Sequence, residues 1–260
     1  MRPASSYRKA QCGISLIELM ISLVVGLIIL AATITTYLLI FKVSVQEIRY
    51  ARLNYDVSSL LLLMKNDLRR SGFSLEAVSG SKPTANPFTT STTDLTINND
   101  WDGNGNSCVT YSYDVSNPGS DAVVDSSEIY GFRRAQDGTV SIRISGTDAS
   151  VANSCSDGDG TWENLNVIEG TEQVFVEELD FSITDLSCHD VDAGNVYTGV
   201  RCRTIAADSA TYPDVKSGNR LVERRIIAVE IIARAEGDTD LTLNESIIVN
   251  ISNDSVLEKP

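Results

Sequence analysis

An uninterrupted apolar segment near the N-terminus constrains this chain more than any other feature. Residues 14–41 contain one charged side chain, Glu18, at the fifth position of the segment. The uncharged part, residues 19–41, exceeds the roughly 20 residues that a helix needs to cross a bilayer. A cleaved secretory signal peptide has a shorter apolar region followed by a small-residue cleavage site, and this segment fits neither description. The segment therefore predicts a membrane-spanning helix.

The charges on either side of this segment predict its orientation. Residues 1–13 carry Arg2, Arg8 and Lys9 and no acidic side chain. By the positive-inside rule this leader stays in the cytoplasm, and the rest of the chain faces the far side of the membrane. Without residues 1–13 the chain keeps 18 basic and 35 acidic side chains, a formal charge of −17. Such an acidic head argues against a nucleic-acid partner, because phosphate binding requires clustered Lys and Arg.

Glu18 needs an explanation, because a carboxylate in a membrane helix is unfavourable unless it reaches water or a cation. It lies about 6 Å along the helix from Ile14, at 1.5 Å per residue. One interpretation is that it snorkels to the bilayer surface. The other is that the chain is cut after Gly13, and Glu18 pairs with the new α-amino group of Ile14 on a neighbouring subunit. The coincidence of the glycine, the apolar onset and the glutamate favours the second interpretation.

The helical pattern continues beyond the membrane segment into residues 42–72. Apolar side chains recur at three- and four-residue spacing, which predicts an amphipathic helix packed on a head. Gly72 is a suitable C-terminal stop, so the whole helix is expected over about residues 14–71. The apolar side chains of this stripe are Leu53, Val57, Leu60, Leu61, Met64 and Leu68.

Residues 73–260 predict a β-rich head, which begins with a loop over residues 76–94. The fold class expected is therefore α+β, with a long N-terminal helix packed on a mainly antiparallel sheet. Several segments alternate apolar and polar side chains as half-buried strands do. The expected strands are residues 94–98, 107–115, 127–134, 139–145, 173–185, 196–204, 220–235 and 241–251.

The cysteines indicate an oxidising compartment. Cys12 lies in the leader, whereas the other four lie in the exported part, and an even number there favours two disulfides. Four cysteines allow three connectivities. Local loop closure favours Cys108–Cys155 together with Cys188–Cys202.

Two acidic loops are candidates for a cation site. The first places Asp100, Asp102 and Asn104 at the alternate positions of an EF-hand loop, but Tyr111 stands where an EF-hand needs Glu. A complete EF-hand is therefore absent.

The second acidic loop contains Asp157 and Asp159. Each loop also holds a tryptophan near one cysteine of the pair Cys108–Cys155, so this disulfide would bring the loops together. They would then share a Ca²⁺ site or pack around their tryptophans, although Asp-Gly and Asn-Gly sequences are also common in turns.

The sequence contains no recognisable catalytic set. His189, the single histidine, lies between Cys188 and Asp190, and a structural zinc site usually takes four Cys or His ligands. A loop histidine beside a disulfide is the simpler interpretation. There is no nucleophile elbow, phosphate-binding loop or dinucleotide-binding glycine pattern, and we expect a protein that is not an enzyme.

Residues 13–19, Gly-Ile-Ser-Leu-Ile-Glu-Leu, closely resemble the class III motif of type IV prepilins and pseudopilins. In that family a membrane aspartyl peptidase cuts after the glycine and methylates the new amine. The resemblance implies a cut between Gly13 and Ile14 and N-methylation of Ile14. The main pilins usually carry Phe at the first mature position and Pro at the twenty-second. Ile14 and Thr35 stand there instead, which is more typical of minor pilins and pseudopilins.

Two further segments resemble the PilW family of minor pilins. They are residues 67–73, with an Arg-Arg-Ser-Gly-Phe sequence at the expected helix end, and residues 224–237. The resemblance implies a subunit that enters the inner membrane with a periplasmic head, meets the prepilin peptidase, and joins other minor pilins and the major pilin in a surface fibre. Pilus assembly and twitching motility would be its readouts. A type II secretion pseudopilin of the J type, a membrane-tethered Ca²⁺-dependent binding module and a membrane-anchored enzyme are the alternatives.

Overall fold

The first element of the chain is a 53-residue helix, α1, over Leu16–Leu68. The computed structural model describes Gly13 and residues 15–74, 86–115, 123–165, 174–235, 241–252 and 255–259. Within the chain, residues 1–50 and residues 51–260 form two separate compact units. The second unit, the head, therefore includes the last part of α1.

Helix α1 contains no proline, and its polar side chains are satisfied within the helix. The hydroxyls of Thr33 and Thr36 donate to the carbonyls of Leu30 and Ala32, at 2.8 and 2.9 Å. Such bonds let hydroxyls lie in an apolar helix without an unsatisfied donor. The helix ends at Leu68, three residues before the expected end, and the chain leaves through a turn to Gly72 at φ 75°.

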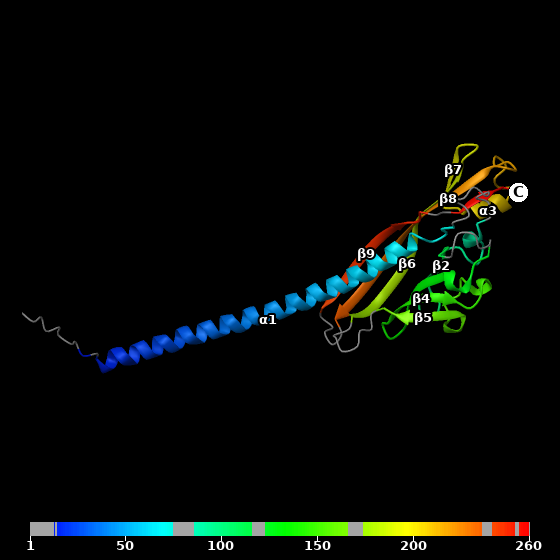
Figure 1. Ribbon diagram of the computed structural model, residues 1–260. Helices are drawn as coiled ribbons and strands as arrows, with labels where there is room; N and C mark the ends of the chain where they lie inside the picture. Colours follow the sequence, from blue (N-terminus) through cyan, green and yellow to red (C-terminus); the bar gives the residue numbers. More distant parts are fainter. Residues whose placement is uncertain are drawn as a thin grey trace, which may run out of the picture. The chain divides into compact units, whose positions relative to one another are not determined.

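The first sheet of the head is antiparallel, with its five strands in sequence order (Figure 1). Each strand pairs with the next one along the chain, which needs only short connections. Strands β3 and β4 are paired on both sides, whereas β1 and β5 form the edges. The strands are β1 Thr96–Asn98, β2 Cys108–Ser112, β3 Ile129–Arg134, β4 Val140–Gly146 and β5 Gly160–Asn164.

The second sheet is also antiparallel and is built on two long strands. Strand β8 pairs with β6 over most of its length, and its other side carries β9 and β10 in succession. The turn after β6 leads into β7, which pairs back onto the end of β6. The strands are β6 Val174–Asp190, β7 Asn195–Thr198, β8 Arg220–Ala235, β9 Thr242–Asn250 and β10 Val256–Glu258.

The predicted apolar stripe of α1 is buried, as expected. All six of its side chains, from Leu53 to Leu68, belong to one core cluster with residues of both sheets, such as Val109 and Val229. Burying such side chains removes apolar surface from water at about 25 cal/mol per Å². The end of α1 is therefore a structural part of the head, and the α+β fold is confirmed with two sheets.

One expected strand is wrong. Residues 196–204 were expected to be extended, but β7 ends at Thr198 and a short helix, α3, follows over Cys202–Ala207. Tertiary contacts explain the helix, because the Glu223 carboxylate accepts the backbone N–H of Cys202 at 2.9 Å and Ile205 is buried. Strands β5 and β10 were not predicted. The remaining short elements are 3-10 helices over Pro87–Thr89, Ser126–Glu128, Ala149–Val151 and Asp157–Asp159.

Candidate functional site

The junction before α1 contains a glycine that local packing does not require. Gly13 is exposed, and no described atom lies within 4 Å of the position that a Cβ would occupy. A larger side chain would fit there without a clash. Glycine at this point therefore suits a close approach by another molecule to the backbone. Ile14 and residues 1–12, which complete the expected cleavage site, lie outside the described residues.

Glu18 lies in the first turn of α1 and is exposed. A carboxylate near the N-terminus of a helix interacts favourably with the partial positive charge there. Within the described residues no cation forms an ion pair with Glu18. This arrangement leaves the carboxylate accessible to a cationic group on another molecule.

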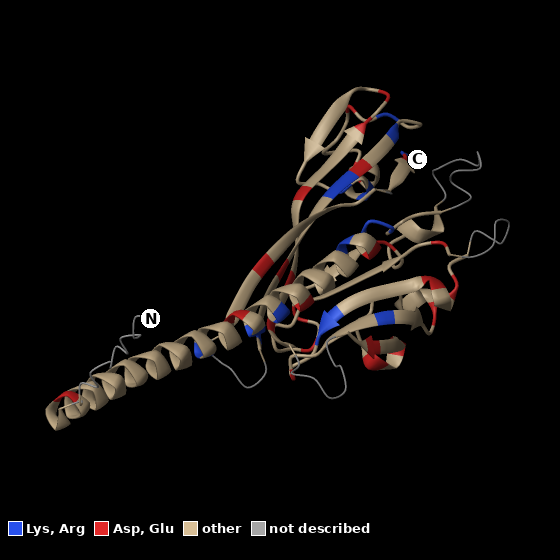
Figure 2. Cartoon of the chain, turned by 60° about the vertical axis from the view of Figure 1, so that its left-hand side comes forward, with Lys and Arg blue, Asp and Glu red and all other residues tan. Residues whose placement is uncertain are grey.

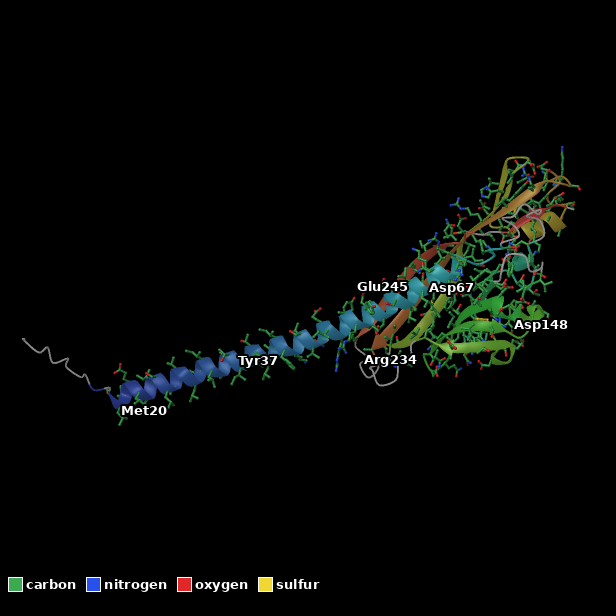
Figure 3. All side chains as sticks on the ribbon, viewed as in Figure 1. Met20, Tyr37, Asp67, Asp148, Arg234 and Glu245 are labelled. Atoms are coloured by element: carbon green, nitrogen blue, oxygen red, sulfur yellow. A yellow bond between two sulfur atoms is a disulfide. The ribbon has the colours of Figure 1, made fainter. Side chains whose placement is uncertain are left out.

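The part of α1 that follows Glu18 is long and apolar enough to cross a membrane. Its most apolar window has a mean hydropathy of 2.6, and none of that window is buried. Figure 2 shows this half of the helix almost free of charge, and Figure 3 shows side chains such as Met20 and Tyr37 projecting outward from it. An apolar surface of this extent requires lipid or other protein around it.

Both disulfides join the cysteines that loop closure favours. Cys108 bonds to Cys155 with a Cα–Cα distance of 6.4 Å, and Cys188 bonds to Cys202 with 5.0 Å. The first disulfide attaches the segment before β5 to strand β2. The second attaches α3 to the end of β6. Both distances lie in the usual range for a disulfide.

The two acidic loops do meet, and a protein cation lies between their tryptophans. The Arg133 guanidinium lies 4.6 Å from the ring centroid of Trp101 and 4.1 Å from that of Trp162. It also donates to the Cys155 carbonyl at 2.5 Å and pairs with Asp157. Cation–π contacts of this kind stabilise by about 0.5–2 kcal/mol each. Of the two arrangements expected for these loops, the structure has the packing around tryptophans.

The carboxylates proposed as Ca²⁺ ligands make hydrogen bonds within their own loops. Asp100 accepts from the backbone N–H of Gly105 at 2.7 Å, and Asp102 accepts from the N–H of Asn104 at 3.1 Å. Asp159 accepts from a serine hydroxyl at 2.5 Å. Among the described residues, no three His, Cys, Asp or Glu side chains gather as a metal site would require. The loops therefore have the geometry of turns.

A hydrogen-bonded cluster joins the end of α1 to the first sheet. The Asp67 carboxylate accepts from the hydroxyls of Tyr111 and Tyr113, at 2.5 and 2.9 Å. Tyr113 in turn stacks on Tyr130, with ring centroids 4.2 Å apart. Burial, and then the negative charge of Asp67, raises the pKa of Tyr111 and of Tyr113 well above the ordinary value.

Two arginines and two carboxylates form a second, largely buried cluster. Arg225 lies 2.9 Å from Asp94 and 3.4 Å from Glu223, and Arg201 contacts both carboxylates. This cluster joins the loop before β1 to β8 and α3. Charges buried in this way are tolerated when each has an oppositely charged partner. The sequence contained a signal for it, because Glu223 and Arg225 have the same strand parity as buried Leu221 and Ile227.

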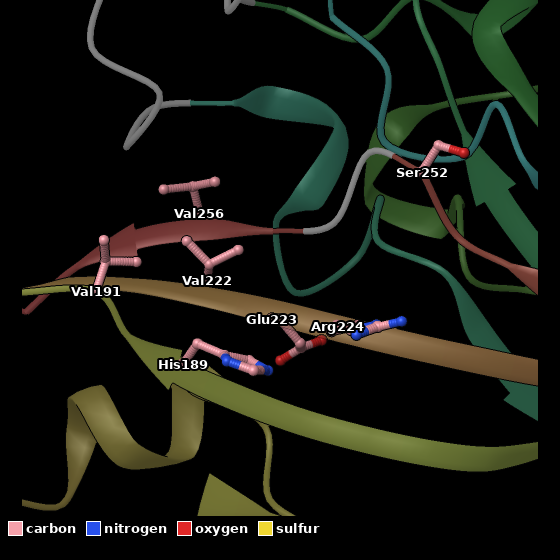
Figure 4. Close-up of a pocket in the computed structure, with 7 residues that line it drawn as sticks. All are labelled: His189, Val191, Val222, Glu223, Arg224, Ser252 and Val256. Carbon is pink, nitrogen blue, oxygen red and sulfur yellow. The ribbon is translucent and has the colours of Figure 1, made fainter. Parts of the chain in front are cut away.

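The single histidine lies at a pocket of about 510 Å³ beside β6, β8 and β10 (Figure 4). The His189 Nε2 atom lies 3.1 Å from the Ser187 hydroxyl. Cys188 is committed to its disulfide, and Asp190 accepts from the Asn219 amide at 2.7 Å. The Cys-His-Asp run therefore has structural partners, in agreement with the simpler interpretation of His189.

The comparisons with known proteins give two family matches. The family described as prepilin peptidase-dependent protein B matches residues 46–251, and the prokaryotic N-terminal methylation motif matches residues 8–34. The comparison with curated proteins gives no match, and neither does the comparison with solved structures.

The two family matches and the structure agree on the kind of protein. The methylation motif includes Gly13 and Glu18, and the larger match covers the head and the part of α1 that the head buries. Proteins of these pilin-like families are structural subunits and not enzymes. The chain therefore belongs to the prepilin peptidase-dependent protein B family and is a type IV pilin-like protein.

Proposed function

We propose that this protein is a minor pilin of the PilW type that helps to start assembly of a type IV pilus. It is inserted in the inner membrane as a precursor and processed after Gly13. It then joins other minor pilins and the major pilin through α1. The observation that carries the proposal is the succession of an unpacked glycine, an apolar exposed helix and one carboxylate in its first turn.

Processing supplies the cation that Glu18 lacks among its described neighbours. A cut after Gly13 creates an α-amino group on Ile14, and methylation leaves its positive charge in place. In the low dielectric of a helix bundle, this group on one subunit attracts Glu18 on the next. An ion pair between ends of neighbouring helices fixes their axial register, since a shift by one turn separates the charges by about 5.4 Å.

The charge distribution and the disulfides support the location. A basic leader favours a cytoplasmic N-terminus and a head across the membrane, in the periplasm. Disulfides such as Cys108–Cys155 form in that oxidising compartment. After assembly the head would lie on the cell-surface fibre.

Mass spectrometry of the purified mature chain tests the processing. We expect the chain to begin at Ile14 and to carry one added methyl group. An intact leader, or a cut beyond Phe41, would refute the proposal. Gly13→Ala should leave the fold of the head unchanged, since a Cβ at Gly13 meets no described atom, yet we expect the leader to be retained.

Substitution of Glu18 tests the contact between subunits. We expect Glu18→Ala to be processed normally but recovered in sheared fibres at a level at least about tenfold lower, because the amine of the neighbour loses its partner. Ser22→Ala is the matched control, since Ser22 lies one turn further along and donates only to the Glu18 carbonyl. Equal recovery of Glu18→Ala and wild type would refute this contact. Loss of protein export without loss of fibres on deletion would assign the protein to a secretion system instead.

A further inference from the structure

Beyond the stripe that the head buries, α1 carries a second row of apolar side chains that remains exposed. Tyr55 is 73 % exposed and Leu62 is 55 % exposed, although both lie in the part of α1 that belongs to the head. Ile48 and Phe41 precede them at the same spacing of seven and are also exposed. A seven-residue apolar spacing is the sequence pattern by which a helix packs against another helix.

This row leads into a groove of about 590 Å³ between α1 and the first sheet. Leu62 and Leu63 lie on the helix wall of the groove. Tyr113, Tyr130, Ile142 and Ile144 lie on the sheet wall. Ile144 is 38 % exposed, so apolar surface is accessible on both walls.

The aromatic part of the groove is held in place by its own contacts. The Tyr113 hydroxyl donates to Asp67 at 2.9 Å, and its ring lies between Tyr130 and the Arg70 guanidinium, at 4.2 and 4.3 Å. Side chains fixed in this way lose little conformational freedom when a partner binds. Tyrosines and buried apolar side chains also contribute most of the energy of typical protein interfaces.

The surroundings of the groove decide which kind of partner fits. Lipid is excluded, because charged residues, among them Lys42, Arg49 and Arg52, separate the membrane segment from Leu62. An added strand is excluded as well, because β3 and β4 are each paired on both sides and offer no free edge here. A helix that follows the exposed row of α1 satisfies both conditions.

We propose that this groove receives the N-terminal helix of another pilin-type subunit. The inference rests on the proposed function, because assembly through α1 brings the helix of a neighbour alongside this row. It adds a contact in the head to the contact of Glu18 near the N-terminus. The head would then recognise its neighbour through Leu62, Leu63, Ile142 and Ile144.

Site-specific photo-cross-linking in the full chain, expressed in its own cells, tests this inference. The photoreactive residue is placed at Leu62 or at Ile144, and Ile248 on β9 serves as a control because it is an equally exposed apolar residue outside the groove. We expect adducts from Leu62 and Ile144, mapped by mass spectrometry to the N-terminal helix of another pilin-type subunit, and no such adduct from Ile248. Adducts to lipid, to the same chain or to an unrelated protein would overturn the proposal, and so would the absence of any adduct.

Substitutions provide an independent measurement. We expect the double variant Leu62→Glu, Ile144→Glu to fall at least about tenfold in recovery from fibres, the effect of removing two interface anchors. Leu62→Met with Ile144→Val should restore recovery, whereas Ile248→Glu should not lower it. Unchanged recovery of the double glutamate variant would refute the groove contact.

The two proposals can fail separately. If the chain is cut after Gly13 and Glu18→Ala blocks incorporation, while the groove positions give no adduct, only the groove inference is wrong. If the leader is retained, the proposed function is wrong, and the groove inference fails with it.

Discussion

The hydroxyl of Tyr111 donates to the carboxylate of Asp67 across 2.5 Å, and this bond joins strand β2 to the last turn of α1. Tyr111 is buried, whereas Asp67 also accepts from Tyr113. A helix that must transmit its position to a head needs such a fixed attachment near its end. The bond also makes the stability of the head sensitive to alkaline pH.

The pKa values of Tyr111 and Tyr113 are raised above 10.0 by burial and by Asp67, so the folded head keeps two phenol protons that the unfolded chain releases. The stabilisation is complete below about pH 10 and is lost as the pH rises further. We expect the free energy of unfolding to fall by about 1.4 kcal/mol per tyrosine for each pH unit above 10. Urea unfolding of the full chain in detergent, followed from neutral to alkaline pH, measures the slope. Tyr111→Phe should fall less steeply than wild type, and identical slopes would contradict this role.

Arg133 should stabilise the two acidic loops, because its guanidinium contacts both tryptophans and the Cys155 carbonyl. We expect Arg133→Met to lower the free energy of unfolding by about 2–3 kcal/mol, mainly through the lost cation–π contacts and hydrogen bond. The tryptophan emission should shift to longer wavelength as water reaches the rings. Arg224→Met, at an exposed position on β8, is the control and should change stability by less than about 0.5 kcal/mol. A variant with wild-type stability and emission would show that Arg133 does not hold the loops.

Ca²⁺ should have no measurable effect on the head, since Arg133 already lies between the tryptophans and the loop carboxylates are occupied by hydrogen bonds. Extracellular Ca²⁺ modules bind at about 10⁻⁴–10⁻³ M, so millimolar Ca²⁺ is a sufficient test. We expect neither heat in calorimetry nor a change in melting temperature when Ca²⁺ is added or removed with a chelator. An increase in melting temperature that disappears in Asp102→Asn would establish a site at the first loop.

Glu223 should be one of the most sensitive positions in the head. Its carboxylate contacts Arg201 and Arg225 and accepts the first N–H of α3 from Cys202. Breaking a buried ion pair typically costs about 3–5 kcal/mol, so we expect Glu223→Gln to destabilise by about 3 kcal/mol. Glu230→Gln, on the exposed face of the same strand, should be nearly neutral. Equal stability of the two variants in urea unfolding would contradict this assignment.

The sequence was informative where a single periodicity extends over many residues. The buried stripe of α1 follows a three- and four-residue spacing, and β8 spans the residues expected for it, because its alternation runs without a break. Both patterns record contact with one large partner, the head core.

Contacts between distant segments were harder to predict. Helix α3 depends on a carboxylate about 20 residues further along the chain, and β5 is short and lacks clear alternation. Arg133 was missed because a lone arginine in a strand does not reveal which rings it will contact. Glu223 and Arg225, in contrast, could have been recognised as inward-facing charges from the alternation of β8.

The disulfide between Cys108 and Cys155 has a consequence for a subunit that is pulled along its fibre. The two cysteines are separated by 47 residues, so roughly 160 Å of extended chain is closed into a loop, at about 3.4 Å per residue. Tension applied at the ends of the chain cannot lengthen this stretch while the bond is intact. Even a partly unravelled head would therefore stretch by that much less, and the fibre would remain shorter under load.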